Sequence, residues 1–317
     1  MHFICTPAFS GGIWGRKKLE RKGPKWYDAG EKETKPEGTG MKTLGYYNGK
    51  YAEIEEMTVP MGDRASWFGD GVYDAGLARD YHMVFLDEHI DRFFRSAEGL
   101  EIRMPVTKSE LRGLLEDLIR KLDTGNLMFY FQVTRGSGIR DHAFPEGKAN
   151  LWITFKPAER NDGSVPGKWI TLEDTRFFHC NLKTLNLIPS VIAAQRAKEA
   201  GCTEAVFYRP GGRVTEGSHS NIHILKDGVL RTAPCDRLIL PGIARAHLLR
   251  ACGALGIPVR EEAFSLEDLF AADEALITIS SQPCGRADTI DGKPVGMKDE
   301  ATFQRLRTYL TNEFLND

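Results

Sequence analysis

From residue 45 onward, short runs of branched and aromatic residues alternate with amphipathic helical segments. The runs VYDAGLA at 72–78, LMFYFQVTR at 127–135 and LWITFKP at 151–157 are typical of strands, and we add TVPM at 58–61 to them. A polar stretch with Gly and Pro but no periodicity, ERNDGSVPGK at 159–168, separates two such blocks. This alternation predicts a mixed α/β (α+β) fold in two domains.

The domain boundaries follow from the same pattern. We expect a small α/β domain at 41–158, a linker at 159–168 and a large domain at 169–317. Residues 1–40 differ from the rest, because they carry eight Lys and Arg against five Asp and Glu and show no periodicity. We interpret 1–40 as an N-terminal extension and expect it to be flexible.

Capping signals and glycines set the expected helix ends. EHIDRFFRSAEGL at 88–100 has apolar residues at helical spacing, and Thr107 with Glu110 forms a capping box for the next helix. Two later helices should end at Gly201 and Gly256, and a last helix covers 302–315. Hairpins are expected around PGG at 210–212 and around Asp227-Gly228.

Composition excludes several classes of protein. The net charge of −2 gives no basic field for nucleic acid, and no apolar run is long enough to cross a membrane. The six cysteines are scattered singly without a C-x-x-C pair, which favours a reducing, cytoplasmic location. There is no H-E-x-x-H or G-x-S-x-G pattern, so neither a metal site nor a nucleophilic serine is predicted.

Two residues are candidates for catalysis. Lys183 stands in a largely uncharged stretch, HCNLKTLNLIPS at 179–190, where partial burial would make its amine nucleophilic and able to form a Schiff base. Glu216, in TEGSHSN at 215–221, could face the pyridine nitrogen of a cofactor. Taken alone, each motif also fits an ordinary surface residue: a lysine at a helix start and a glutamate in a hairpin connection.

Other residues could bind anions. Gly242 opens a helix whose free N–H groups suit a phosphate, and Arg92 and Ser280 could add donors. Arg140 and His142 are two residues apart in a long loop, so both can face a carboxylate. The alternatives here are a turn glycine, a surface arginine, a turn serine and a mobile surface loop.

Six motifs in this order resemble the class IV aminotransferases, and most closely the D-amino-acid transaminases among them. They are FGDGVYD at 68–74, LDEHIDR at 86–92, QVTRGSGIRDHAFP at 132–145, CNLKTLNL at 180–187, VTEGSHSN at 214–221 and LILPGI at 238–243. The similarity covers nearly all of the chain from about Gly45 onward. It implies the two-domain class IV fold of D-amino-acid and branched-chain aminotransferases, with pyridoxal 5'-phosphate (PLP) as cofactor.

The resemblance also implies residue roles. Lys183 would hold PLP as a Schiff base and act as the catalytic base, with Glu216 at the ring nitrogen. The remaining cofactor contacts would come from Arg92, Leu240, Ser280 and the backbone N–H groups of Ile243 and Ala244. Substrate would be bound by Tyr73, Arg140 and His142, the last two from a neighbouring subunit, so the resemblance implies a homodimer with a shared active site.

The expected reaction is ping-pong transfer of an amino group between a D-amino acid, such as D-alanine, and a 2-oxo acid, such as 2-oxoglutarate. Alternatives are a branched-chain or (R)-amine transaminase, a PLP lyase similar to aminodeoxychorismate lyase, and a non-catalytic PLP-binding protein. The chain departs from the family pattern at Ala244, where relatives usually have Thr, and at His219, which replaces a serine. The segment SSQPCGR at 280–286 should put Arg286 near the substrate.

Overall fold

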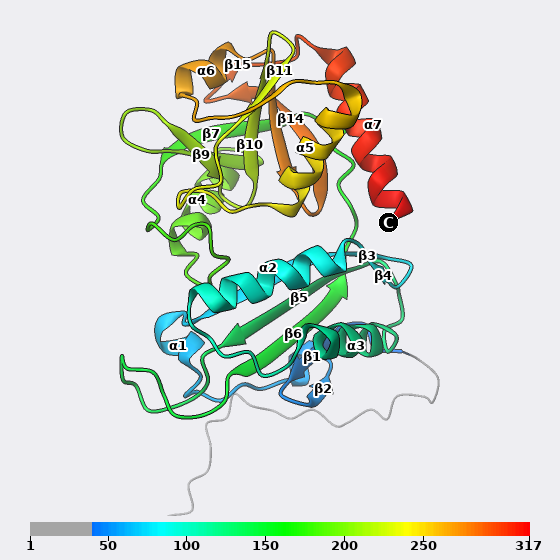
Figure 1. Ribbon diagram of the computed structural model, residues 1–317, viewed down its shortest axis with the longest axis vertical. Helices are drawn as coiled ribbons and strands as arrows, with labels where there is room; N and C mark the ends of the chain where they lie inside the picture. The colour runs from blue at the N-terminus through cyan, green and yellow to red at the C-terminus, as the bar shows by residue number, and fades with distance from the viewer. Residues whose placement is uncertain (1–39) are drawn as a thin grey trace, which may run out of the picture. The chain divides into compact units, whose positions relative to one another are not determined.

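The computed structural model describes residues 40–317, and these form one compact unit. Their strands gather into two sheets, in the orders β2-β1-β6-β5-β3-β4 and β12-β11-β10-β13-β14-β7-β8-β9, with β15 paired to β14 (Figure 1). Residues 158–166 connect the sheets without helix or strand. The predicted mixed α/β class is confirmed, whereas the division into domains stays a prediction and the proposed extension lies outside the described residues except for Gly40.

The first sheet is antiparallel throughout. Its strands are β1 (Leu44–Tyr47), β2 (Lys50–Ala52), β3 (Gly71–Arg79), β4 (His82–Met83), β5 (Leu127–Thr134) and β6 (Asn150–Pro157). The helices in this part of the chain are a 3-10 turn (Ile54–Glu56), α1 (Arg64–Phe68), α2 (Leu86–Gly99) and α3 (Lys108–Ile119).

Alternation of side chains explains why helices cover one face of this sheet. Phe129, Phe131 and Val133 are fully buried in one core cluster with Phe93 of α2 and Leu115 of α3. The residues between them on β5 turn to the opposite face and are less buried. That opposite face leaves the odd-numbered residues of β3 free to line a site.

In this part of the chain one local sequence prediction is confirmed and another is wrong. The capping box is confirmed, because Thr107 accepts from the Glu110 amide and Glu110 accepts from the Thr107 amide. The strand expected at 58–61 is wrong. Val59 and Met61 are 45% and 86% exposed, so the segment has no core to pack against, and Pro60 has no N–H for a ladder.

The second sheet mixes parallel and antiparallel pairs. Its strands are β7 (Gly167–Glu173), β8 (Glu204–Tyr208), β9 (Val214–Gly217), β10 (Asn221–Lys226), β11 (Val229–Thr232), β12 (Val259–Glu261), β13 (Glu274–Ile279), β14 (Gln282–Ile290) and β15 (Lys293–Pro294). The helices are α4 (Ile188–Glu199), α5 (Ile243–Leu255), α6 (Leu266–Ala271) and α7 (Glu300–Asn316). In Figure 1, α5 and α7 lie beside each other along this sheet.

Two of the three core clusters on the second sheet involve β10 and β13, because these strands are apolar on both faces. Ile222 and Ile224 belong to one cluster, while Leu225 and Leu276 belong to another that includes residues of α5 and α7. Both expected hairpins are confirmed, and Asp227 has φ of 50° in the β10–β11 turn. No helix among residues 40–317 is long and apolar enough to cross a membrane.

Candidate active site

A cavity of about 300 Å³ gathers the residues that the sequence singled out. Its walls come from β3, the segment before α4, the β9–β10 turn, the start of α5 and the β13–β14 turn. Eight predicted site residues line it: Tyr73, Arg92, Lys183, Glu216, Leu240, Ile243, Ala244 and Ser280. The volume lies at the lower end of the range of about 300–1,000 Å³ that is usual for ligand pockets.

Lys183 is fixed through its backbone, which leaves its amine available. Its amide donates to the Ser96 hydroxyl at 3.1 Å, and its carbonyl accepts from the Tyr73 amide at 2.9 Å. The amine lies 4.5 Å from the centre of the Tyr73 ring. It forms no ion pair with any of residues 40–317. The site therefore presents an uncommitted amine in a cavity wall.

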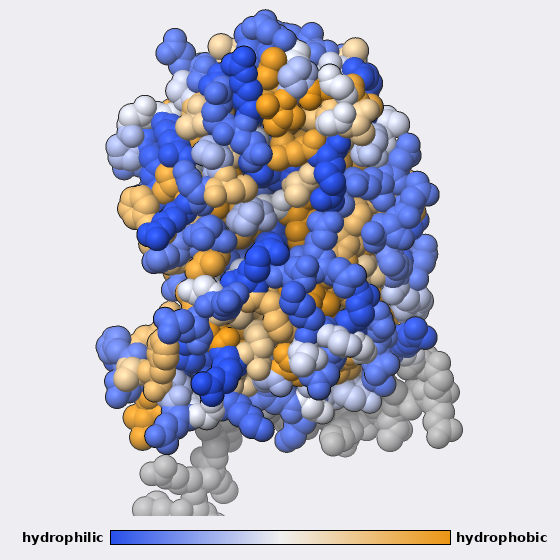
Figure 2. All heavy atoms as spheres, in the orientation of Figure 1, coloured by the Kyte–Doolittle hydropathy of each residue, from blue (hydrophilic) through white to orange (hydrophobic). Residues whose placement is uncertain are grey.

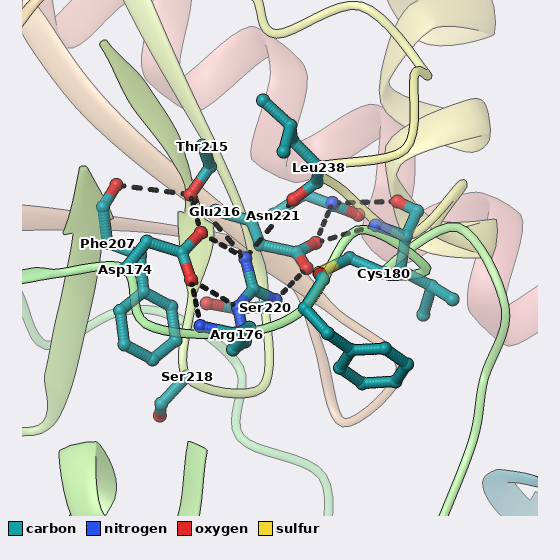
Figure 3. Close-up of polar contacts among 12 residues, drawn as sticks. Asp174, Arg176, Cys180, Phe207, Thr215, Glu216, Ser218, Ser220, Asn221 and Leu238 are labelled. Carbon is teal, nitrogen blue, oxygen red and sulfur yellow. Dashed lines mark hydrogen bonds and ion pairs between the residues drawn. The ribbon is translucent and has the colours of Figure 1, made fainter. Parts of the chain in front are cut away.

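Glu216 is a buried carboxylate in the opposite part of the wall, held by three donors (Figure 3). Arg176 pairs with one carboxylate oxygen, and the other accepts from the Asn221 amide side chain at 3.0 Å and the Leu240 amide at 2.9 Å. Burial raises the pKa of the Glu216 carboxyl to about 6, although the guanidinium of Arg176 acts to lower it. At neutral pH Glu216 is therefore mainly a carboxylate.

Arg176 is itself held in place by Asp174. Its Nε and Nη2 donate to the two Asp174 oxygens at 3.0 and 2.9 Å, and Figure 3 shows the guanidinium between Asp174 and Glu216. Thr215 also donates to Asp174 at 2.9 Å. The sequence analysis did not predict a role for Asp174 or Arg176. The acid–arginine spacing in EDTR at 173–176 is the signal that could have indicated them.

Arg92 is buried and oriented by a second pair of missed residues, Asp74 and His89. Its Nε and Nη2 each donate to Asp74 at 2.7 Å, and His89 Nδ1 lies 2.7 Å from the same carboxylate. Burial alone would raise the pKa of the Asp74 carboxyl, but Arg92 and His89 outweigh it and hold that pKa well below its usual range. Nη1 of Arg92 makes no hydrogen bond within residues 40–317 and remains as the free donor at the cavity wall.

The start of α5 completes an anion-binding end of the cavity. No side chain among residues 40–317 caps this helix, so the N–H groups of Ile243 and Ala244 are not satisfied by a cap. Gly242 is required there, because a Cβ would lie 2.0 Å from the Asn221 Oδ1. Together with Ser280 and Arg92, this helix end provides donors and a positive dipole for a phosphate.

These features fit the cofactor expected from the sequence. An amine without an ion pair suits covalent attachment of an aldehyde, and a buried carboxylate suits a protonated pyridine nitrogen. The uncapped helix end beside the free Arg92 donor suits the phosphate group. One cavity thus contains a partner for the aldehyde, the pyridine nitrogen and the phosphate of PLP.

Arg140 and His142 are brought together, but not into this cavity. The Arg140 guanidinium lies 5.1 Å from the centre of the Phe68 ring, and the His142 ring lies 5.2 Å from it. Buried Arg64 fixes the loop by donating to the carbonyls of Asp141, His142 and Ala143. Both predicted carboxylate-binding side chains are exposed, away from Lys183 of their own chain.

The expectation that Arg286 lies near the substrate is wrong. Arg286 is on β14, is 6% exposed and pairs with Glu274 and Glu300, with its guanidinium 4.1 Å from the Phe303 ring centre. It does not line the cavity. A buried arginine requires a carboxylate partner, and the fully buried Glu274 provides one on the side of α7.

Packing explains why a glycine stands at position 76 of β3. A Cβ at Gly76 would lie 2.4 Å from the Phe129 ring and 2.8 Å from His89 Nε2. Any larger residue would displace the histidine that contacts Asp74. The glycine at position 76 therefore leaves room for His89 and the Arg92 network.

The chain is similar in sequence to known aminotransferases. A family model described as amino-transferase class IV matches residues 71–290. A D-alanine aminotransferase of Listeria monocytogenes serotype 4b is 39% identical over 287 residues, covering 87% of this chain and 96% of that protein.

Solved structures agree on the fold. A branched-chain aminotransferase from Thermoproteus uzoniensis with norvaline has a TM-score of 0.79 at 24% identity, covering 88% of this chain and 96% of that one. The T.th. branched-chain amino acid aminotransferase complexed with N-(5'-phosphopyridoxyl)-L-glutamate has a TM-score of 0.78 at 24% identity, with the same two coverages.

Proposed function

Since this chain belongs to the class IV aminotransferases, a family of PLP enzymes, we propose that it acts on D-amino acids. The amino donor would be a D-amino acid such as D-alanine, and the acceptor a 2-oxo acid such as 2-oxoglutarate. The observation that carries the proposal is one cavity in which Lys183, Glu216 and the uncapped start of α5 meet.

Preference for the D-series is supported by two features. The chain is 39% identical to a protein named D-alanine aminotransferase over nearly the whole length of that protein. It also carries Arg140 and His142 two residues apart on a loop that Arg64 holds in a fixed shape. A fixed pair of donors can orient a substrate carboxylate, and that orientation decides which face of Cα meets Lys183.

The roles of the chain's own residues follow from their contacts. When bound, PLP supplies an electron-poor pyridine ring that stabilises negative charge at the substrate Cα. Lys183 removes the proton from Cα with its amine, and the Tyr73 ring beside it limits where that amine can move. Glu216 holds the proton at the ring nitrogen, while Arg92 and the start of α5 hold the phosphate.

We propose that the enzyme is a homodimer in which each loop 135–149 completes the partner's cavity. Arg140 and His142 do not line the cavity of their own chain. On the same loop Ile139 is 95% exposed and Phe144 60% exposed, which is unusual for apolar side chains unless a partner covers them. Figure 2 shows hydrophobic side chains at the surface where this loop and α1 lie, at the lower left.

We also propose that the enzyme works in the reducing cytoplasm. All five cysteines among residues 40–317 are free, namely Cys180, Cys202, Cys235, Cys252 and Cys284. Free thiols at this number of positions are typical of proteins that are kept reduced.

A half-reaction tests the substrate proposal. The PLP-loaded protein is mixed separately with D-alanine, L-alanine, L-leucine and (R)-1-phenylethylamine, and the visible absorbance of bound PLP is followed while oxo products are assayed. We expect the band to disappear with D-alanine and pyruvate to form, with little change for the other three compounds. Loss of the band with L-leucine instead would assign the chain to branched-chain substrates and contradict the D-specific proposal.

A further inference from the structure

The turn between β9 and β10 places a histidine in the wall of the cavity. His219 lines the cavity and its side chain is 58% exposed. The two neighbouring serines point to the buried carboxylate beneath the turn, since Ser218 and Ser220 donate to Glu204 at 2.5 and 2.6 Å. All three residues line the cavity, and His219 is the exposed one among them.

Hydrogen bonding fixes one nitrogen of the His219 ring and leaves the other free. The single hydroxyl proton of Ser218 goes to Glu204, so the Ser218 oxygen accepts from His219 Nδ1 at 2.9 Å. Nδ1 also lies 3.3 Å from the second oxygen of Glu204. Nε2 has no partner within residues 40–317, and because Nδ1 is already a donor, Nε2 donates to a ligand when the ring binds as an imidazolium.

The other cationic side chains of the cavity are committed elsewhere. Arg92 is bound to Asp74 and its remaining donor, Nη1, is assigned to the phosphate of PLP, while Arg176 is bound to both Asp174 and Glu216. Lys183 is the residue expected to bind PLP. Two histidines remain. Among residues 40–317 the ring of His179 contacts only the Phe177 ring, at 5.7 Å, whereas His219 is anchored by a hydrogen bond to Ser218. An anchored donor loses less side-chain freedom when it binds a ligand.

We propose that His219 binds the distal carboxylate of a dicarboxylic substrate, such as 2-oxoglutarate or D-glutamate. The proposal rests on the proposed transaminase function, because it concerns substrates of the same cavity. Nε2–H donates to the side-chain carboxylate, while Ser218 and Glu204 hold the ring in position. His219 is therefore a specificity residue, and it favours dicarboxylic over monocarboxylic acceptors.

Steady-state kinetics with two acceptors test the assignment. D-alanine is the donor for 2-oxoglutarate, and D-glutamate is the donor for pyruvate. In His219→Ser the KM for 2-oxoglutarate should rise about tenfold, the size expected for one charge-assisted hydrogen bond at a partly exposed site, while the KM for pyruvate and both kcat values stay within about twofold. His219→Arg should restore most of the loss, and His179→Ser, which removes the unanchored histidine, should leave the ratio of the two KM values unchanged.

Ligand binding gives a second readout that does not depend on turnover. Calorimetric titration of the PLP-loaded protein with glutarate and with butyrate measures the contribution of a second carboxylate. The preference for glutarate should fall about tenfold in His219→Ser.

Two results would overturn the assignment. An equal rise in KM for pyruvate and 2-oxoglutarate would mean that His219 acts on the α-carboxylate or on the fold, and an unchanged glutarate preference would mean that it makes no contact. Failure of the wild-type protein to convert D-alanine would instead contradict the proposed function, and the glutarate titration would still test His219.

Discussion

Glu216 and His219 lie three residues apart in the same cavity wall, yet their surroundings differ. Glu216 is buried and receives three donors, whereas His219 is 58% exposed and is held by Ser218 and Glu204 through one nitrogen. The same contrast separates buried Arg92, bound twice to Asp74, from exposed Arg140. Glu216 and Arg92, which are assigned to PLP, are thus fixed by several buried contacts, whereas His219 and Arg140, which are assigned to the substrate, are more exposed.

This difference has a physical reason. The cofactor is the same in every turnover, so fixed and desolvated partners cost nothing in substrate range and strengthen each electrostatic contact. The substrate must enter, change and leave twice in each cycle, which requires accessible groups. Substitution of a cofactor-binding residue should therefore change PLP binding or stability, whereas substitution of a substrate-binding residue should change KM. The following predictions test this contrast in decreasing order of effect.

The largest effect is expected at Lys183. Lys183→Ala removes both the covalent attachment and the proposed base, and kcat should fall by at least about 10³-fold, within the range known for loss of a general base. The visible absorbance of covalently bound PLP should also disappear. Activity assays measure the fall in kcat, and absorption spectra measure the loss of the bound-PLP band. Full turnover in this variant would show that Lys183 is not the base.

Asp74→Asn should destabilise the fold, because it leaves the buried guanidinium of Arg92 without its carboxylate. Breaking a buried pair typically costs about 3–5 kcal/mol. The free energy of unfolding of the cofactor-free protein in urea measures this change. Asp91→Asn is the matched control, because Asp91 pairs with Lys108 on the surface of α2 and should contribute less than about 1 kcal/mol.

Arg176→Gln should change the pH dependence of PLP binding. The Glu216 carboxyl has a pKa of about 6, so it is charged above that pH and becomes neutral as the pH falls through it. PLP affinity should therefore weaken below about pH 6, and loss of Arg176, which lowers this pKa, should move the transition to higher pH. Fluorescence titrations with PLP across pH 5–8 would measure the midpoint.

Arg209→Gln is the control for that experiment. Arg209 lies 3.3 Å from Asp174 but is not paired with Glu216, so its loss should leave the midpoint unchanged. Equal shifts in both variants would mean that Asp174, and not the direct contact with Glu216, controls the transition.

The smallest effect is expected at the loop that carries Arg140 and His142. Arg64→Ala removes the donors to three loop carbonyls, so the KM for D-alanine should rise about tenfold while the affinity for PLP stays within about twofold. Arg112→Ala, at a largely exposed surface pair, is the control and should change neither quantity. A loss of PLP affinity in Arg64→Ala would contradict the proposed separation between cofactor-binding and substrate-binding residues.

The sequence was most informative where chemistry and local structure coincide. Lys183, Glu216 and Gly242 each stand in a short motif with a recognisable end of a strand or helix, and all three line the cavity. Their roles stay predictions, as do those of Arg140 and His142.

Partners that are distant in the chain were not predictable. Arg176 and Glu216 are 40 residues apart and Asp74 and Arg92 are 18 apart, so no local spacing indicates that they meet. The same limitation produced the wrong expectation for Arg286, whose position depends on Glu274 and Glu300. Proximity in sequence to the cavity residue Ser280 did not predict where the Arg286 side chain lies, because Ser280 is in the β13–β14 turn whereas Arg286 is inside β14 and contacts α7.

The most direct test of the account is to identify the residue that carries the cofactor. The protein is loaded with PLP, reduced with borohydride, digested, and its peptides are analysed by mass spectrometry. We predict a phosphopyridoxyl group on Lys183 and unmodified lysines elsewhere in the chain. A stable label on another lysine, or no label after full loading with PLP, would contradict the assignment of this cavity as the active site.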